Sequence, residues 1–162
     1  MRKSPPFLAI LLSTVLSFST PCGAAPPAAG LTPAQDFQSD ARESAKKGLP
    51  ILILYSLPGC PSCEVIRRSH LLPMIREGKA QVIVRQVDLN SPKALKDFNG
   101  RITTHGDYAQ GQGIRFAPIV KLVGPDGNEL ADSLTGTLLP DFYAAYLDDA
   151  IAAARTKLKA AS

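Results

Sequence analysis

The chain has 162 residues, of which 45% are hydrophobic and 20% are charged. This composition is typical of one globular domain and excludes a disordered chain. The formal net charge of +4 is too small to predict binding to nucleic acid or to an anionic membrane surface, and no basic stripe is visible.

The first 24 residues have the layout of a secretory signal peptide. After a positively charged start comes the apolar stretch 7–18, "FLAILLSTVLSF", and then small residues that favour cleavage after Ala24. The apolar stretch is shorter than the roughly 20 residues of a membrane span. We therefore expect residues 1–24 to be a cleaved signal peptide on an exported protein.

Export changes the count of charges and of cysteines. Removing residues 1–24 takes away two basic residues and no acidic one, so the net charge falls from +4 to +2. It also removes Cys22, which leaves Cys60 and Cys63 as the remaining cysteines. In an oxidising compartment such a pair can form a disulfide.

A short linker is expected to precede the folded domain. Residues 25–31 are rich in proline and alanine and are expected to form a flexible linker before one domain at 32–160. A helix is predicted over 32–47, with Gly48 as its C-terminal stop. The continuous apolar run 49–55 predicts a strand buried on both faces of a sheet.

The next elements predict a strand–helix–strand unit. Helical spacing begins at the cysteine pair and ends at Gly78, and Pro73 is expected to kink or divide the helix. A strand is predicted over 80–89, so the two strands should be parallel. Residues 91–98 predict a short helix, and 99–113 predict a polar loop containing a helical turn.

The last third predicts a hairpin and a long helix. Strands are expected over 118–124 and 129–134 around the turn "GPDGN". A helix over 140–158 should cover the sheet with one apolar face, formed by Phe142, Tyr146 and Ile151. The predicted fold class is therefore α/β, with a four-stranded mixed sheet flanked by helices on both faces.

The cysteine pair lies where the first strand passes into a helix. Unpaired N–H groups at a helix start stabilise an anion, so Cys60 should be a nucleophilic thiolate. Cys63, one turn later, is expected to be the buried partner that resolves a mixed disulfide. The negative charge of Glu64 opposes formation of the thiolate, and the positive charges of Arg67 and Arg68 offset part of that effect. The sequence does not decide which of the two effects is larger.

Zinc and a static disulfide are the competing explanations of the pair. Structural zinc needs four ligands, but His70 lies about two turns beyond Cys63 on the same predicted helix, a poor direction for reaching one metal. A disulfide that closes so small a loop adds little stability. We therefore expect a redox-active pair, with no metal and no cofactor, and keep a static disulfide as the alternative.

At this point the sequence resembles the thioredoxin superfamily, over roughly 49–158. The resemblance is carried by Cys60-Pro61-Ser62-Cys63 after a buried strand, by "VDL" with Asp88, by "GIRFAPIVKLVGPDGNEL", and by Gly136 before the last helix. It is most similar to small exported thioredoxin-like proteins of bacteria, which implies a periplasmic protein.

The resemblance implies roles for two further residues. Pro118 should follow a cis peptide bond and face the cysteines, and the backbone of Ala117 should pair with an extended substrate segment. Two positions depart from the family's pattern: Leu54 stands where thioredoxins carry a buried acid, and Gly59 stands where they carry tryptophan. His105 is a candidate proton carrier, although a histidine in a polar loop is more often solvated.

We therefore expect an exported thiol-disulfide oxidoreductase that exchanges disulfides with disulfide-containing or dithiol client proteins. A separate redox partner should recycle the Cys60–Cys63 pair. The short linker at 25–31 provides no dimerisation region, so a monomer is expected. The second hypothesis is a binding or assembly module that keeps the fold and a static disulfide, and the third is a copper or zinc carrier.

Overall fold

A buried strand lies at the centre of the fold. The structure is a computed structural model that describes Met1 and residues 30–136 and 142–161. All six residues of this strand, β1 (Ile51–Ser56), are buried. It pairs in parallel with β2 (Ile83–Asp88) and antiparallel with β5 (Ile119–Val123). With β6 (Leu134–Thr135) the order is β2-β1-β5-β6, so the predicted four-stranded mixed sheet is confirmed.

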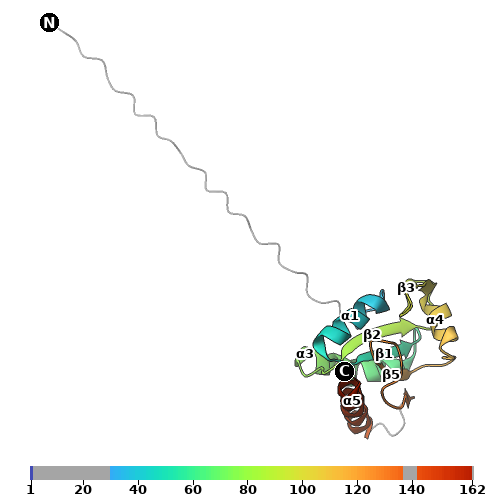
Figure 1. The fold of residues 1–162 in the computed structure, drawn as a ribbon. Coiled ribbons are helices and arrows are strands. Elements are labelled where there is room, and N and C mark those ends of the chain that lie inside the picture. The colour runs from blue at the N-terminus through green and yellow to red at the C-terminus, as the bar shows by residue number, and fades with distance from the viewer. Residues whose placement is uncertain (2–29, 137–141, 162) are drawn as a thin grey trace.

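Helices cover both faces of this sheet, as expected, with α1 and α5 on opposite sides (Figure 1). The signal peptide predicted over 1–24 and most of the linker lie outside the described residues. None of the helices in the described part of the chain is long and apolar enough to cross a membrane. The remaining elements are α1 (Phe37–Lys47), α2 (Pro61–Val65), η1 (Ile66–Leu71), α3 (Leu72–Arg76), β3 (Ala94–Lys96), β4 (Ile102–Thr104), α4 (His105–Gly111) and α5 (Tyr143–Ala160).

Two apolar clusters fill the space above and below the sheet. Alternation along β1 sends Leu52 and Leu54 to the side covered by η1, α3 and α5, and Ile53 and Tyr55 to the side covered by α1 and α4. We call these the α5 face and the α1 face. Leu31, the last residue of the predicted linker, is buried on the α5 face.

The first helix begins later than predicted. The stretch after Leu31 runs beside the sheet, with a parallel bridge between Pro33 and Gln86. Asp36, not Thr32, caps α1, and its side chain accepts a hydrogen bond from the N–H of Ser39 at 2.9 Å. The predicted end is correct, since Gly48 has a φ of 63° at the C-cap.

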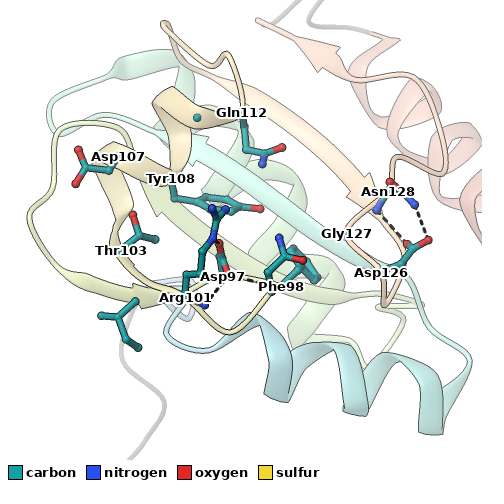
Figure 2. Close-up of a pocket in the computed structure, with 13 residues that line it drawn as sticks. Asp97, Phe98, Arg101, Thr103, Asp107, Tyr108, Gln112, Asp126, Gly127 and Asn128 are labelled. Atoms are coloured by element: carbon teal, nitrogen blue, oxygen red, sulfur yellow. Dashed lines mark hydrogen bonds and ion pairs between the residues drawn. The ribbon is translucent and has the colours of Figure 1, made fainter.

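The helix predicted over 91–98 is wrong, because this segment contains β3, which pairs with β4 in a small antiparallel sheet. The turn between the strands is organised by Asp97, whose carboxylate accepts N–H groups of Asn99 and Arg101, each at 2.9 Å. The side chain of Arg101 adds a third bond to the same carboxylate (Figure 2). The loop predicted over 99–113 is therefore β4 followed by α4.

The helix after the cysteines is divided, but not by Pro73 alone. The π-helical segment η1 comes first, where the N–H of Leu72 reaches back to the carbonyl of Arg67. Pro73 then lies in the first turn of α3, where its missing N–H matters least. The structure thus has three consecutive helical pieces where the sequence predicts a helix that Pro73 kinks or divides.

The C-terminal helix presents a different face from the predicted one. Phe142 and Tyr146 are exposed, by 60% and 47%, whereas Ile151 is buried as expected. The buried positions follow a regular helical stripe: Tyr143, Leu147, Ile151, Ala154 and Leu158. The returning strand is also shorter than predicted, since Glu129 makes only an isolated bridge to Val123 and β6 begins at Leu134.

His105 is buried, not solvated, and its ring nitrogens form hydrogen bonds that join three segments on the α1 face. Its Nδ1 accepts the N–H of Asp88 at 3.1 Å, so Nε2 carries the hydrogen and donates to the carbonyl of Ala34 at 2.7 Å. The side chain is 1% exposed. This neutral imidazole joins the start of α4, the end of β2 and the N-terminal segment.

Replacing His105 with alanine is expected to lower the free energy of unfolding by about 2–4 kcal/mol, because the Asp88 N–H and the Ala34 carbonyl lose their partners. Urea denaturation measures this loss. Gln110→Ala, an exposed change on the same helix, serves as the control and should leave stability unchanged. Equal stability of the His105→Ala variant and the wild type would contradict the assignment.

Asp97 gives the fold a pH dependence. Burial alone would raise the pKa of Asp97, but the hydrogen bonds from Arg101 and Asn99 outweigh it and hold the pKa below its usual value. The carboxylate therefore adds stability above the unfolded-state pKa, and this stability is lost as the pH falls through the lower folded-state pKa. Asp97→Asn should cost about 1 kcal/mol at pH 7 and much less at pH 2–3. Urea denaturation at both pH values checks this, with the exposed Asp149→Asn as a control; a pH-independent loss would refute it.

Candidate functional site

The site lies at one edge of the sheet, where β1 ends and β5 begins. In the sheet register Ser56 lies opposite Asp88, and Tyr55 lies opposite Ile119. Cys60 follows the end of β1 after a short loop, and Pro118 immediately precedes β5. The topology therefore brings the predicted cysteine pair and the predicted proline to the same edge.

The two cysteines form a disulfide, with an S–S distance of 2.13 Å and a Cα–Cα distance of 5.3 Å. Cys60 is the N-cap of α2, and its Sγ accepts the backbone N–H of Cys63 at 3.1 Å. Pro61 occupies the first helical position, which tolerates a residue without an N–H. Cys60 is partly exposed and Cys63 is fully buried, which is the asymmetry expected of an attacking and a resolving cysteine.

The charged side chains that follow the cysteine pair form ion pairs with one another. Glu64 makes ion pairs with both Arg67 and Arg68. The hydrogen bond from Arg67 is the main reason why the pKa of Glu64 lies below its usual value. Glu64 is thus held as a carboxylate at neutral pH and is poorly suited to carry protons for the cysteines.

A partly buried chain of polar side chains lies beside the cysteine loop. The guanidinium of Arg67 donates from Nε to Gln86 and from Nη2 to Ser56, both at 3.0 Å. Gln86 in turn donates to Asp88 at 2.7 Å. Ser56 and Gln86 were not predicted from the sequence, although Ser56 is a polar residue at the end of the apolar run of β1 and Gln86 lies near the end of β2.

Leu54 lies in β1, two residues before the end of the strand. It is fully buried on the α5 face and lies between Gln86 and Val120 in the sheet register. A carboxyl group is therefore absent at this position of the described structure. His105 does not replace it, because both of its ring nitrogens are already bonded on the α1 side.

The opposite wall of the site is the segment before β5. The peptide bond between Ala117 and Pro118 is cis, the geometry that the resemblance implied. The Pro118 carbonyl accepts the N–H of Gly136 at 2.9 Å, which ties this segment to the end of β6. Ala117 is partly exposed, and Phe116 beside it is 55% exposed. Phe116 lies within the motif quoted from the sequence, but only Ala117 and Pro118 were predicted to have a role there.

Two cavities differ in their relation to the disulfide. One of about 350 Å³ borders the cysteine loop and is lined by Pro58, Gly59, Arg67 and Asp88, among others. A larger one of about 510 Å³ lies between the β3–β4 turn, α4 and the turn after β5 (Figure 2). Because β5 starts at the cysteine edge and ends at Val123, this larger cavity lies toward the opposite edge.

Comparisons with known proteins agree with this architecture. No curated protein matches the sequence. A thioredoxin-fold protein from Helicobacter pylori superposes with a TM-score of 0.50 at 17% identity, covering 70% of this chain and 81% of that chain. Thioredoxin f from spinach chloroplast (short form) also gives a TM-score of 0.50, at 18% identity, covering 77% of this chain and 96% of that one.

These structural similarities establish the fold alone, because the identities are low. The family comparison goes further, since a family model described as a thioredoxin-like domain matches residues 37–151. That range contains the cysteine pair, the cis-proline segment and the first half of α5. The chain belongs to the thioredoxin-like domain family.

Proposed function

We propose that this protein is an exported thiol-disulfide oxidoreductase whose reacting groups are Cys60 and Cys63. One observation carries the proposal: a disulfide at a helix N-terminus, with one sulfur partly exposed and bonded to a backbone N–H and the other buried. The helix N-terminus stabilises the thiolate of Cys60 once the pair is reduced. The buried Cys63 is held within reach for the second step.

The exchange proceeds in two balanced steps. The Cys60 thiolate attacks a sulfur of a client disulfide, forms a mixed disulfide and releases one client thiolate. The Cys63 thiolate then attacks Cys60, closes the intramolecular disulfide and releases the second client thiolate, which takes up a proton. The client gains two electrons and the pair loses two; the reverse sequence oxidises a client dithiol.

The segment at Ala117 and Pro118 is proposed to hold the client. It lies at the same sheet edge as the pair, and Ala117 is partly exposed. An extended client segment can pair with the Ala117 backbone as an added strand, which presents its disulfide to Cys60. The small side chain of Ala117 leaves this approach wide.

The proposed setting is the periplasm, with a separate redox partner that recycles the pair. The signal-peptide layout of residues 1–24 supports export. An oxidising compartment supports a disulfide-exchanging protein, whose direction depends on its recycling partner. The protein is proposed to act as a monomer.

A Cys63→Ser variant is expected to trap clients. Without the resolving thiol, the mixed disulfide at Cys60 persists and should appear as reducible adducts on non-reducing gels of periplasmic extracts. Cys60→Ser is the matched control and should trap nothing, because the attacking sulfur is gone. Absence of adducts from the Cys63→Ser variant would count against client exchange.

The reduction potential of the pair should separate turnover from a static disulfide. Equilibration with glutathione buffers is expected to give a value between about −120 and −270 mV, the range of exchanging proteins. A potential below about −300 mV would instead support the binding-module alternative, because structural disulfides lie there. Alkylation of Cys60 in the reduced protein, faster than that of a free thiol at pH 7, is the accompanying result.

A further inference from the structure

A third cavity lies between η1, α3 and α5, away from the cysteine loop. Its volume is about 410 Å³, within the range of about 300–1,000 Å³ that small-ligand pockets occupy. Met74, Leu147 and Ile151 give it an apolar lining that continues the core of the α5 face. Gln81, also in the lining, lies two residues before β2, at the end of that strand remote from Asp88. The cavity is therefore separate from the site of the proposed disulfide exchange.

Arg155 lines this cavity and has no partner. Its Nε is one of three buried side-chain polar atoms without a hydrogen bond in the described part of the chain. Four other arginines donate from Nε to a side-chain oxygen at 2.9 or 3.0 Å: Arg67, Arg68, Arg85 and Arg101. A buried N–H group that is left unpaired destabilises the fold. The guanidinium of Arg155 is therefore a cation whose donors the fold itself does not use.

The charges of the cavity reduce to one anion and one cation. Glu77 and Lys79 form an ion pair at 2.8 Å and cancel each other. Partial burial lowers the pKa of His70 despite the nearby carboxylate of Asp148, so this imidazole is largely neutral at pH 7. Asp148 and Arg155 are left, and neither belongs to an ion pair among residues 30–136 and 142–161. A ligand that satisfies both must carry a positive and a negative group.

The spacing of the two charged residues sets the length of such a ligand. Asp148 and Arg155 are seven residues apart on α5, nearly two helical turns, so they lie on one face of the helix. A rise of about 1.5 Å per residue separates their Cα atoms by about 10 Å along the axis. The apolar side chains of Ile151 and Ala152 line the cavity between them. An extended peptide advances about 3.3–3.6 Å per residue, so three residues span this separation.

We propose that this cavity binds a short peptide with free ends and an apolar middle, its terminal ammonium at Asp148 and its terminal carboxylate at Arg155. The carboxylate accepts N–H groups of the guanidinium, whose planar fork matches a carboxylate. The ammonium donates to the carboxylate of Asp148, and apolar peptide side chains contact Met74 and Ile151. A simple anion fits less well, because it would leave Asp148 unpaired as a like charge in the same cavity.

Isothermal titration of the protein with the tripeptide alanyl-leucyl-alanine tests the proposal. One peptide is expected to bind per chain. Acetylating its amino end, or amidating its carboxyl end, should weaken binding about tenfold, because each block removes one charge-assisted interaction. These comparisons use the unchanged protein, so they do not depend on the folding of a variant.

Two variants assign the ends of the peptide. Arg155→Met should weaken binding of the free tripeptide about tenfold but should not weaken binding of the amidated one further, and Asp148→Asn should show the same pattern with the acetylated peptide. Arg76→Met and Asp149→Asn are the matched controls, because both residues are exposed and neither lines the cavity. Both controls should bind the tripeptide as the wild type does.

Three outcomes would overturn the proposal. The first is no binding of the free tripeptide at millimolar concentration. The second is equal affinity for free and doubly blocked peptides, which would mean that the charged ends are not recognised. The third is weakening by the amide and by Arg155→Met alone, with no effect of acetylation or of Asp148→Asn, which would make the ligand a simple carboxylate.

Discussion

The burial of β1 on both faces is the constraint on which the site depends. Each of its six residues is covered, so a shift of one position would move every side chain to the wrong face. Pairing with β2 and β5 fixes the strand from both sides. The chain can leave this strand only at Ser56, and the cysteine loop and the start of β5 therefore meet at one edge.

The two cysteines experience opposite influences at that edge. Cys60 lies at the partly exposed N-terminus of α2, where a backbone N–H bonds to its sulfur. Cys63 is fully buried, which disfavours its ionised form. The polar chain of Arg67, Gln86 and Asp88 lies beside the cysteine loop and is joined to the end of β1 through Ser56.

The parts of the fold that could be predicted are those set by neighbouring residues. The apolar run before Cys60 identified β1, and Pro61 placed the helix start directly after it. Residues 91–98 were misassigned because their strand is stabilised by distant partners, including the bridge from Asp36 to Lys96. The partners of His105 and Arg67 lie up to 71 residues away, so no local pattern reports them.

The contacts that hold the scaffold together on the α1 face are separate from the cysteine site. This separation explains why Leu54, a departure from the thioredoxin pattern, is compatible with the fold. On the α1 face, His105 and the aromatic stack of Phe37 on Phe98, with ring centroids 4.7 Å apart, fasten the helices and the β3–β4 sheet. These contacts do not involve the cysteines. The α5 face can therefore carry Leu54 in place of a buried acid while the contacts that hold the scaffold together on the α1 face remain.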